Sequence, residues 1–130
     1  MTGWRAWVPA LLWAAVLFAV SSRSTLPGDL GGGIDKLAHF GAYAVLGVLL
    51  ARAAVGSRWS IAWPVLIGLA YAASDEIHQY FVPGRSADAG DWLADALGVG
   101  AGCLLVYRVL SGRLRQRAAA DDVSAGSVSP

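Results

Sequence analysis

Residues Asp91 to Gly102 read DWLADALGVGAG, a stretch that places acidic and small residues on one side of a helix. At about 3.6 residues per turn, the positions i, i+4, i+7 and i+11 share one helical face; here they are Asp91, Asp95, Gly98 and Gly102. The glycine pair has the small-xxx-small spacing that lets another helix approach closely inside a membrane. The stretch therefore predicts a helix whose acidic face is also its packing face.

The chain around this stretch has the composition of a membrane protein. Of its 130 residues, 56% are hydrophobic and 15% are charged, and the mean hydropathy is +0.53. Four apolar segments each approach the roughly 20 residues that cross a hydrocarbon core. They are Trp4 to Val20, Leu37 to Val55, Trp59 to Ala73 and Trp92 to Leu110. We therefore expect an all-α integral membrane bundle of four transmembrane helices with short loops.

The ends of this bundle are less regular than its centre. We expect residues 1–112 to form the transmembrane domain and residues 113–130 to form a cytoplasmic tail, basic in RLRQR and then disordered in AAADDVSAGSVSP. The first segment could also be a signal peptide, because Arg5 precedes its apolar core and SSRS follows it. We interpret it as retained. The third segment is short unless the helix continues as far as Phe81.

The distribution of lysine and arginine predicts the orientation of the chain. One side holds Arg5, Arg52, Arg58, Arg108, Arg113, Arg115 and Arg117, and the other holds Arg23, Lys36 and Arg85. Cytoplasmic loops carry the excess of positive charge. We therefore expect both termini in the cytoplasm and the acidic motifs at the outer face of a bacterial plasma membrane.

The second segment opens with a polar motif, DKLAHFGAY. This motif places Asp35, His39 and Tyr43 at i, i+4 and i+8, on one helical face. Lys36 precedes His39 by three residues and lies close to the same face. The outer end of this helix is therefore expected to present a base, an acid and a cation together.

The third segment ends in another polar motif, SDEIHQYFVPGR. Gln79 is four residues after Asp75 and three after Glu76, so its carboxamide can lie near both acids. The Pro-Gly pair predicts a turn, which could bring Arg85 back over these side chains.

These motifs are expected to form one polar pocket. An ionised side chain that faces lipid at a helix centre costs about 2.5 to 3.5 kcal/mol, so such groups turn toward the bundle interior. The candidate catalytic residues are Glu76, Asp75, His39 and Asp91. The candidate ligand-binding residues are Lys36, Asp35, Gln79, Arg85, Asp95 and Tyr43.

Two blocks of the chain, DKLAHFGAYAVLG and SDEIHQYFVPGRSADAGDWLADALG, resemble the signature blocks of the VanZ-like family. These are small multi-pass membrane proteins named after a teicoplanin-resistance protein. The resemblance covers roughly Arg23 to Gly102 and implies a role at the cell envelope, with glycopeptide tolerance in some members. Its motif positions are Asp35, Lys36, His39, Asp75, Glu76, Gln79, Pro83, Arg85 and Asp91. The family commonly has Asn where this chain has Asp95.

The pocket is compatible with three functions. It could bind the head group of a lipid or of a lipid-linked envelope precursor, with Lys36 and Arg85 suited to a phosphate. It could belong to an enzyme that acts on such a lipid by carboxylate and His39 acid-base chemistry, although no nucleophile motif accompanies it. It could also be a network that only orients the helices. We favour binding.

Other ligands and partners are limited by the composition. No cofactor is expected, although the carboxylates offer hard oxygen ligands for Mg²⁺ or Ca²⁺; no spacing indicates a zinc site. The ten basic residues are dispersed, which disfavours a nucleic-acid surface. The expected partners are the bilayer and an envelope ligand. Gly98 and Gly102 could pack within the bundle or against a second copy of the chain.

Overall fold

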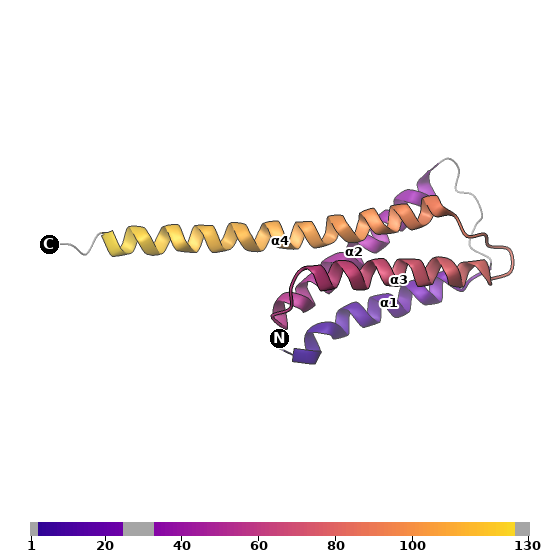
Figure 1. Cartoon of the computed structure of the whole chain (residues 1–130), viewed down its shortest axis with the longest axis horizontal. Coiled ribbons are helices and arrows are strands. Elements are labelled where there is room, and N and C mark those ends of the chain that lie inside the picture. Colours follow the sequence, from indigo (N-terminus) through magenta and orange to yellow (C-terminus); the bar gives the residue numbers. More distant parts are fainter. Residues whose placement is uncertain (1–2, 25–32, 127–130) are drawn as a thin grey trace.

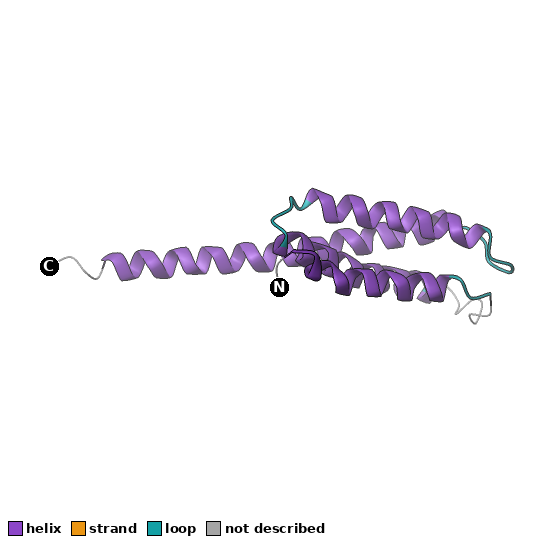
Figure 2. Cartoon of the chain, turned by 90° about the horizontal axis from the view of Figure 1, so that it is seen from below, coloured by secondary structure: helices purple, strands orange, loops and turns teal. Residues whose placement is uncertain are grey.

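The protein is described by a computed structural model over residues 3–24 and 33–126. These residues form an all-α fold with four α-helices and no strands (Figures 1 and 2). The elements are the short 3-10 helix η1 (Gly3–Trp7), α1 (Val8–Ser21), α2 (Ile34–Gly56), α3 (Ala62–Tyr80) and α4 (Ala89–Gly126).

Three helical segments are long and apolar enough to cross a membrane, by length and composition, within the described part of the chain. They are Gly3–Ser21, Ile34–Gly56 and Ala89–Arg113. Large apolar side chains such as Leu11, Phe18 and Leu104 are exposed on them. Such exposure suits lipid and not water. The membrane class expected from the sequence is therefore confirmed.

Helix α3 does not belong to this apolar set. It has 19 residues, but its last turns carry the polar sequence SDEIHQY. The helix continues past Ala73 to Tyr80, and this continuation is what the third segment needs in order to approach the length of a membrane span. It begins at Ala62 and not at Trp59. That α3 also crosses the membrane stays a prediction.

Helices α2 and α4 form the most extensive helix pair. A Cβ atom added at Gly98 would collide with the backbone carbonyl of Phe40, and one added at Gly102 would collide with that of Ala44. The two glycines therefore allow direct contact between the two backbones, as a small-xxx-small pair does in a membrane. The glycine face of α4 packs inside the bundle against α2.

Helices α1 and α3 contact each other and complete the bundle (Figure 1). Two aromatic side chains donate hydrogen bonds to backbone carbonyls and so connect α1 to α2 and α3. Tyr71 Oη of α3 donates to the Ala14 carbonyl at 2.6 Å, and Trp13 Nε1 donates to the Ala42 carbonyl of α2 at 2.9 Å. These bonds satisfy polar groups inside the bundle, because lipid hydrocarbon cannot form hydrogen bonds with them.

The C-terminal segment belongs to α4 as far as Gly126. Helix α4 continues from the bundle through Arg113 to Gly126 and projects beyond the other helices (Figure 1). That residues 113–130 form a cytoplasmic tail, first basic and then disordered in AAADDVSAGSVSP, stays a prediction. The Arg, Leu, Gln and Ala residues of RLRQRAAA are strong helix formers. Extending an existing helix also needs no new nucleus. Low hydrophobicity therefore does not end this helix; residues 127–130 lie outside the described part.

Candidate functional site

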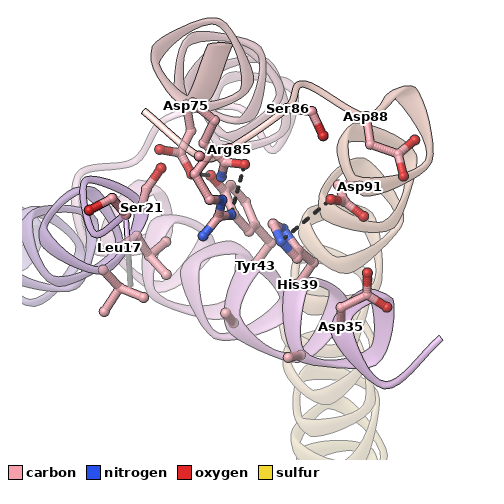
Figure 3. A pocket seen from close by; sticks show the side chains of 16 residues that line it. Leu17, Ser21, Asp35, His39, Tyr43, Asp75, Arg85, Ser86, Asp88 and Asp91 are labelled. Atoms are coloured by element: carbon pink, nitrogen blue, oxygen red, sulfur yellow. Dashed lines mark hydrogen bonds and ion pairs between the residues drawn. The ribbon is translucent and has the colours of Figure 1, made fainter. Parts of the chain in front are cut away.

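A cavity of about 530 Å³ lies between α1, α2, α3 and the α3–α4 loop, at one end of the bundle (Figure 3). Most of the residues selected from the sequence line it: Asp35, His39, Tyr43, Asp75, Gln79, Arg85 and Asp91. The others, Lys36, Glu76 and Asp95, lie behind the wall and bond to residues that line it. The structure therefore brings all three sequence motifs to one site.

Arg85 reaches the cavity because the chain reverses directly after α3. Arg85 N donates to the Val82 carbonyl at 3.1 Å, and Gly84 has a φ of +79°. Proline followed by a positive-φ glycine is the sequence of a type II turn. The guanidinium then points into the cavity (Figure 3), where Nη2 donates to Gln79 Oε1 at 3.0 Å. Within the described residues Arg85 forms no ion pair.

His39 is oriented by two acids of α4. Its Nδ1 bonds to Asp95 Oδ1 at 2.9 Å, and its Nε2 lies 3.9 Å from Asp91 Oδ2. Asp95 is only 1% exposed, whereas His39 and Asp91 both line the cavity. A buried carboxylate on one ring nitrogen fixes the orientation of the imidazole and directs the other nitrogen. The imidazole is therefore held against the cavity wall.

Tyr43 and Asp75 form a second buried pair. Tyr43 Oη donates to Asp75 Oδ2 at 2.8 Å, and both residues are at least nine-tenths buried. Asp75 Oδ1 has no hydrogen-bond partner among the described residues, and the same holds for Ser21 Oγ. Both residues line the cavity. An acid and a hydroxyl thus offer acceptors on this side of the cavity.

Asp88 lies directly before the first residue of α4 and forms several contacts there. Its Oδ1 accepts from Gly90 N at 2.7 Å, which makes Asp88 the N-cap of the helix. Lys36 Nζ bonds to Asp88 Oδ2 and Asp91 Oδ1, each at 2.8 Å. The Lys36 ammonium holds the pKa of the Asp88 carboxyl below its usual value. Glu76 Oε1 accepts from Asp88 N, so the loop is also anchored to α3.

Two contributions to the site are not apparent from the motifs alone. Helix α1 supplies Leu17, Val20 and Ser21 to the wall, Ser24 follows it, and Asp88 pairs with Lys36. The position of Asp88, three residues before Asp91 at the start of a helix, is a typical N-cap signal. No signal in α1 identifies the helix face that meets the cavity, because α1 is apolar on all sides.

Metal binding has no direct geometric support in the described part of the chain. Among those residues, no group of three or more His, Cys, Asp or Glu side chains is placed to hold a metal ion. The acids of the site are instead engaged by Lys36, His39 and Tyr43. A site for Mg²⁺ or Ca²⁺ stays a prediction.

The fold and the site together define an α-helical membrane protein with a polar cavity at one end of the bundle. The chain belongs to the VanZ/LLP1 family, whose family model matches residues 4–111. The match extends from η1 to the part of α4 that packs in the bundle. Searches of the curated proteins and of the solved structures gave no significant match. The family resemblance of the two sequence blocks is therefore confirmed.

Proposed function

We propose that this VanZ/LLP1 protein binds the head group of a phosphate-bearing lipid, or of a lipid-linked envelope precursor, in the polar cavity. The observation that carries the proposal is the state of Arg85, which points into the cavity without an ion pair among the described residues. The other cation near the site, Lys36, is engaged by Asp88 and Asp91. Arg85 is thus the cation available to an anionic ligand.

The chemistry of Arg85 favours a phosphate. A guanidinium presents five N–H donors in a planar fork that matches phosphate oxygens two at a time. The bond to Gln79 Oε1 uses one donor of Nη2 and also orients the group. The remaining donors support binding of a phosphate oxygen pair.

The opposite wall favours hydrogen-bond donors on the same head group. Asp75 and Ser21 both line the cavity, and each carries a buried oxygen without a hydrogen-bond partner in the described residues. Leaving such a group unpaired in a complex costs about 1 to 3 kcal/mol. A head group with hydroxyl or amino groups beside its phosphate therefore fits better than one without them.

We also propose that all four helices cross a bacterial plasma membrane, with both termini in the cytoplasm and the cavity at the outer face. The polar side chains that lower the hydropathy of α3 do not face lipid, because Asp75, Glu76 and Gln79 are 5%, 8% and 2% exposed. The 19 residues of α3 extend about 28 Å at about 1.5 Å per residue, close to the ~30 Å of a hydrocarbon core. The seven-to-three arginine and lysine bias supports the orientation.

Family membership supports a consequence at the cell envelope. A protein that binds a lipid-linked precursor at the outer face would alter how that precursor is presented. Altered tolerance to glycopeptide antibiotics such as teicoplanin is the effect we propose.

Native mass spectrometry of the purified protein tests the proposal. We expect the wild type to retain a phosphate-bearing lipid. Because charge-assisted hydrogen bonds contribute about 1.5 to 3 kcal/mol, Arg85→Gln should lower retention about tenfold or more. Arg52→Gln is the matched control, since Arg52 is exposed on α2 and does not line the cavity. Equal retention by all three proteins, or an adduct of inorganic phosphate alone, would contradict the proposal.

One arrangement favours a second candidate, acid-base catalysis on the bound lipid. His39 Nδ1 is held by the buried Asp95, which leaves Nε2 at the cavity wall near Asp91. The same arrangement orients the general base in hydrolases. If the wild type, but not His39→Gln, converts a retained lipid into a species of different mass during incubation, catalysis replaces binding as the function.

A further inference from the structure

A second cavity lies in the other half of the bundle, between the same three helices. It has a volume of about 430 Å³, and its walls are apolar; they include Ala10, Ala14, Leu46, Leu50, Ile67 and Tyr71. The hydroxyl of Tyr71 is already bonded to the Ala14 carbonyl. The surface of this cavity therefore suits hydrocarbon.

The two cavities adjoin along all three helices. On each helix, the nearest residues of the two linings are separated by about one turn of about 5.4 Å. These pairs are Leu17 and Ala14 on α1, Tyr43 and Leu46 on α2, and Asp75 and Tyr71 on α3. The polar and the apolar cavity therefore lie one after the other along α1, α2 and α3.

Two tyrosines mark the boundary between the two cavities. The ring centroids of Tyr43 and Tyr71 are 6.2 Å apart. Tyr43 lines the polar cavity and bonds to Asp75, whereas Tyr71 lines the apolar cavity and bonds to α1. Amphipathic aromatic side chains commonly lie where polar surface meets apolar surface in a membrane.

Taken together, the two linings extend over about the length of one lipid molecule. Along α2 they extend from Asp35 to Leu50, which a helix separates by about 22 Å at about 1.5 Å per residue. One leaflet, with its head-group region, is about 20 to 22 Å thick, half of the bilayer. A lipid with its head group beside Arg85 would place the end of its chain beside Leu50.

We propose that the two cavities form a single site for one lipid, with the phosphate head group in the polar cavity and one hydrocarbon chain in the apolar cavity. This inference rests on the proposed binding function and extends it to the hydrophobic part of the ligand. A chain gains little hydrophobic free energy when it moves from the bilayer into an apolar cavity. Occupancy of the apolar cavity must therefore depend on the head-group contacts, above all on Arg85.

Photocrosslinking tests this dependence. The probe is phosphatidylglycerol with a diazirine at the methyl end of one acyl chain, diluted into nanodiscs of the phosphate-free lipid digalactosyldiacylglycerol that contain the full chain. Crosslinks are mapped by mass spectrometry. We expect them on residues of the apolar cavity, including Leu46, Leu50 and Ile67, and we expect at least a fivefold loss with Arg85→Gln. Diacylglycerol with the same labelled chain has no phosphate. It should therefore label the apolar cavity of the wild type as weakly as the phosphate-bearing probe labels that of Arg85→Gln.

A matched pair of variants on α3 tests the cavity itself. Ile67→Phe fills part of the apolar cavity and should reduce these crosslinks severalfold. Leu66→Phe should not reduce them, since Leu66 is 56% exposed and does not line the cavity. An equal effect of the two variants would contradict the inference.

The remaining outcomes separate this inference from the proposed function. Crosslinks confined to exposed positions such as Leu66, alongside lipid retention that still depends on Arg85, would overturn the single site and leave head-group binding intact. Crosslinks within the apolar cavity that Arg85→Gln does not reduce would show that bulk lipid fills it, which also overturns the single site. Retention that is independent of Arg85 in the mass-spectrometric test would instead overturn the binding function.

Discussion

Asp95 is the residue at which this chain departs from the pattern that the family resemblance implies, which commonly has Asn. Its Oδ1 bonds to His39 Nδ1, while its Oδ2 is buried without a hydrogen-bond partner among the described residues. The carboxylate therefore uses one oxygen in the way that an Asn side chain would. The interaction explains how both residue types suit the position.

We predict that Asp95→Asn changes thermal stability little, because the amide oxygen still accepts from His39. Asp95→Ala should destabilise the protein by roughly 1 to 3 kcal/mol, since it leaves the imidazole without this partner. Tryptophan fluorescence during thermal unfolding in detergent measures both effects. Equal losses for Asn and Ala would show that the charge, and not the hydrogen bond, stabilises the site.

Asp88 has two separable roles, as N-cap of α4 and as ion-pair partner of Lys36. Because the folded-state pKa of Asp88 lies below its usual value of 3.8, the ion pair stabilises the fold above about pH 4. This contribution is lost as the pH falls through the folded-state pKa. Asp88→Asn keeps a capping oxygen but removes the charge.

We predict that the stability difference between wild type and Asp88→Asn is largest near pH 6 and shrinks as the pH is lowered toward 3. The expected difference is small, because the pair is exposed to solvent. Melting temperatures measured across this range provide the test. A difference that does not change with pH would exclude the ion pair as its cause. Asp88→Ala should be less stable than Asp88→Asn at every pH, since it also removes the cap.

At the scale of the elements, the contact between α2 and α4 depends on two glycines. We predict that Gly98→Ala destabilises the bundle by about 1 to 3 kcal/mol, because its Cβ would overlap the Phe40 carbonyl and force the helices apart. Gly100→Ala is the control, as open space surrounds that position on the same helix. It should be neutral or slightly stabilising. Resistance to unfolding in SDS compares the two, and equal losses would mean that close backbone contact is unimportant.

Helix α3 shows how far composition alone describes an element. Its polar end lowers its hydropathy, yet Asp75, Glu76 and Gln79 of that end are buried in the bundle. A hydropathy average does not register which way a side chain points, so it underestimates a helix that faces a polar interior. Helix α4 shows the converse, because it is helical as far as Gly126 although the sequence after Arg113 contains few large apolar residues.

At the scale of the whole molecule, the two ends of the bundle should lie on opposite sides of the membrane. We predict that a membrane-impermeant maleimide labels Ser86→Cys in intact cells, because the proposed orientation places the α3–α4 loop outside. Ser60→Cys, in the α2–α3 loop, should react only after lysis. Both positions are exposed, and the native Cys103 is buried, which limits background labelling. Labelling of both sites in intact cells would show that α3 does not cross the membrane.

The sequence by itself determined the membrane class, the turn before Arg85 and the residues that share each helical face. These features depend on local properties: the length of an apolar run, the 3.6-residue period and the backbone preferences of Pro and Gly. Only the tertiary structure decided which faces meet. It placed α1 across the cavity, paired His39 with Asp95 and positioned Asp88 against Lys36. Such contacts join segments that are distant in the chain, and they arise from packing, which periodicity within one helix does not encode.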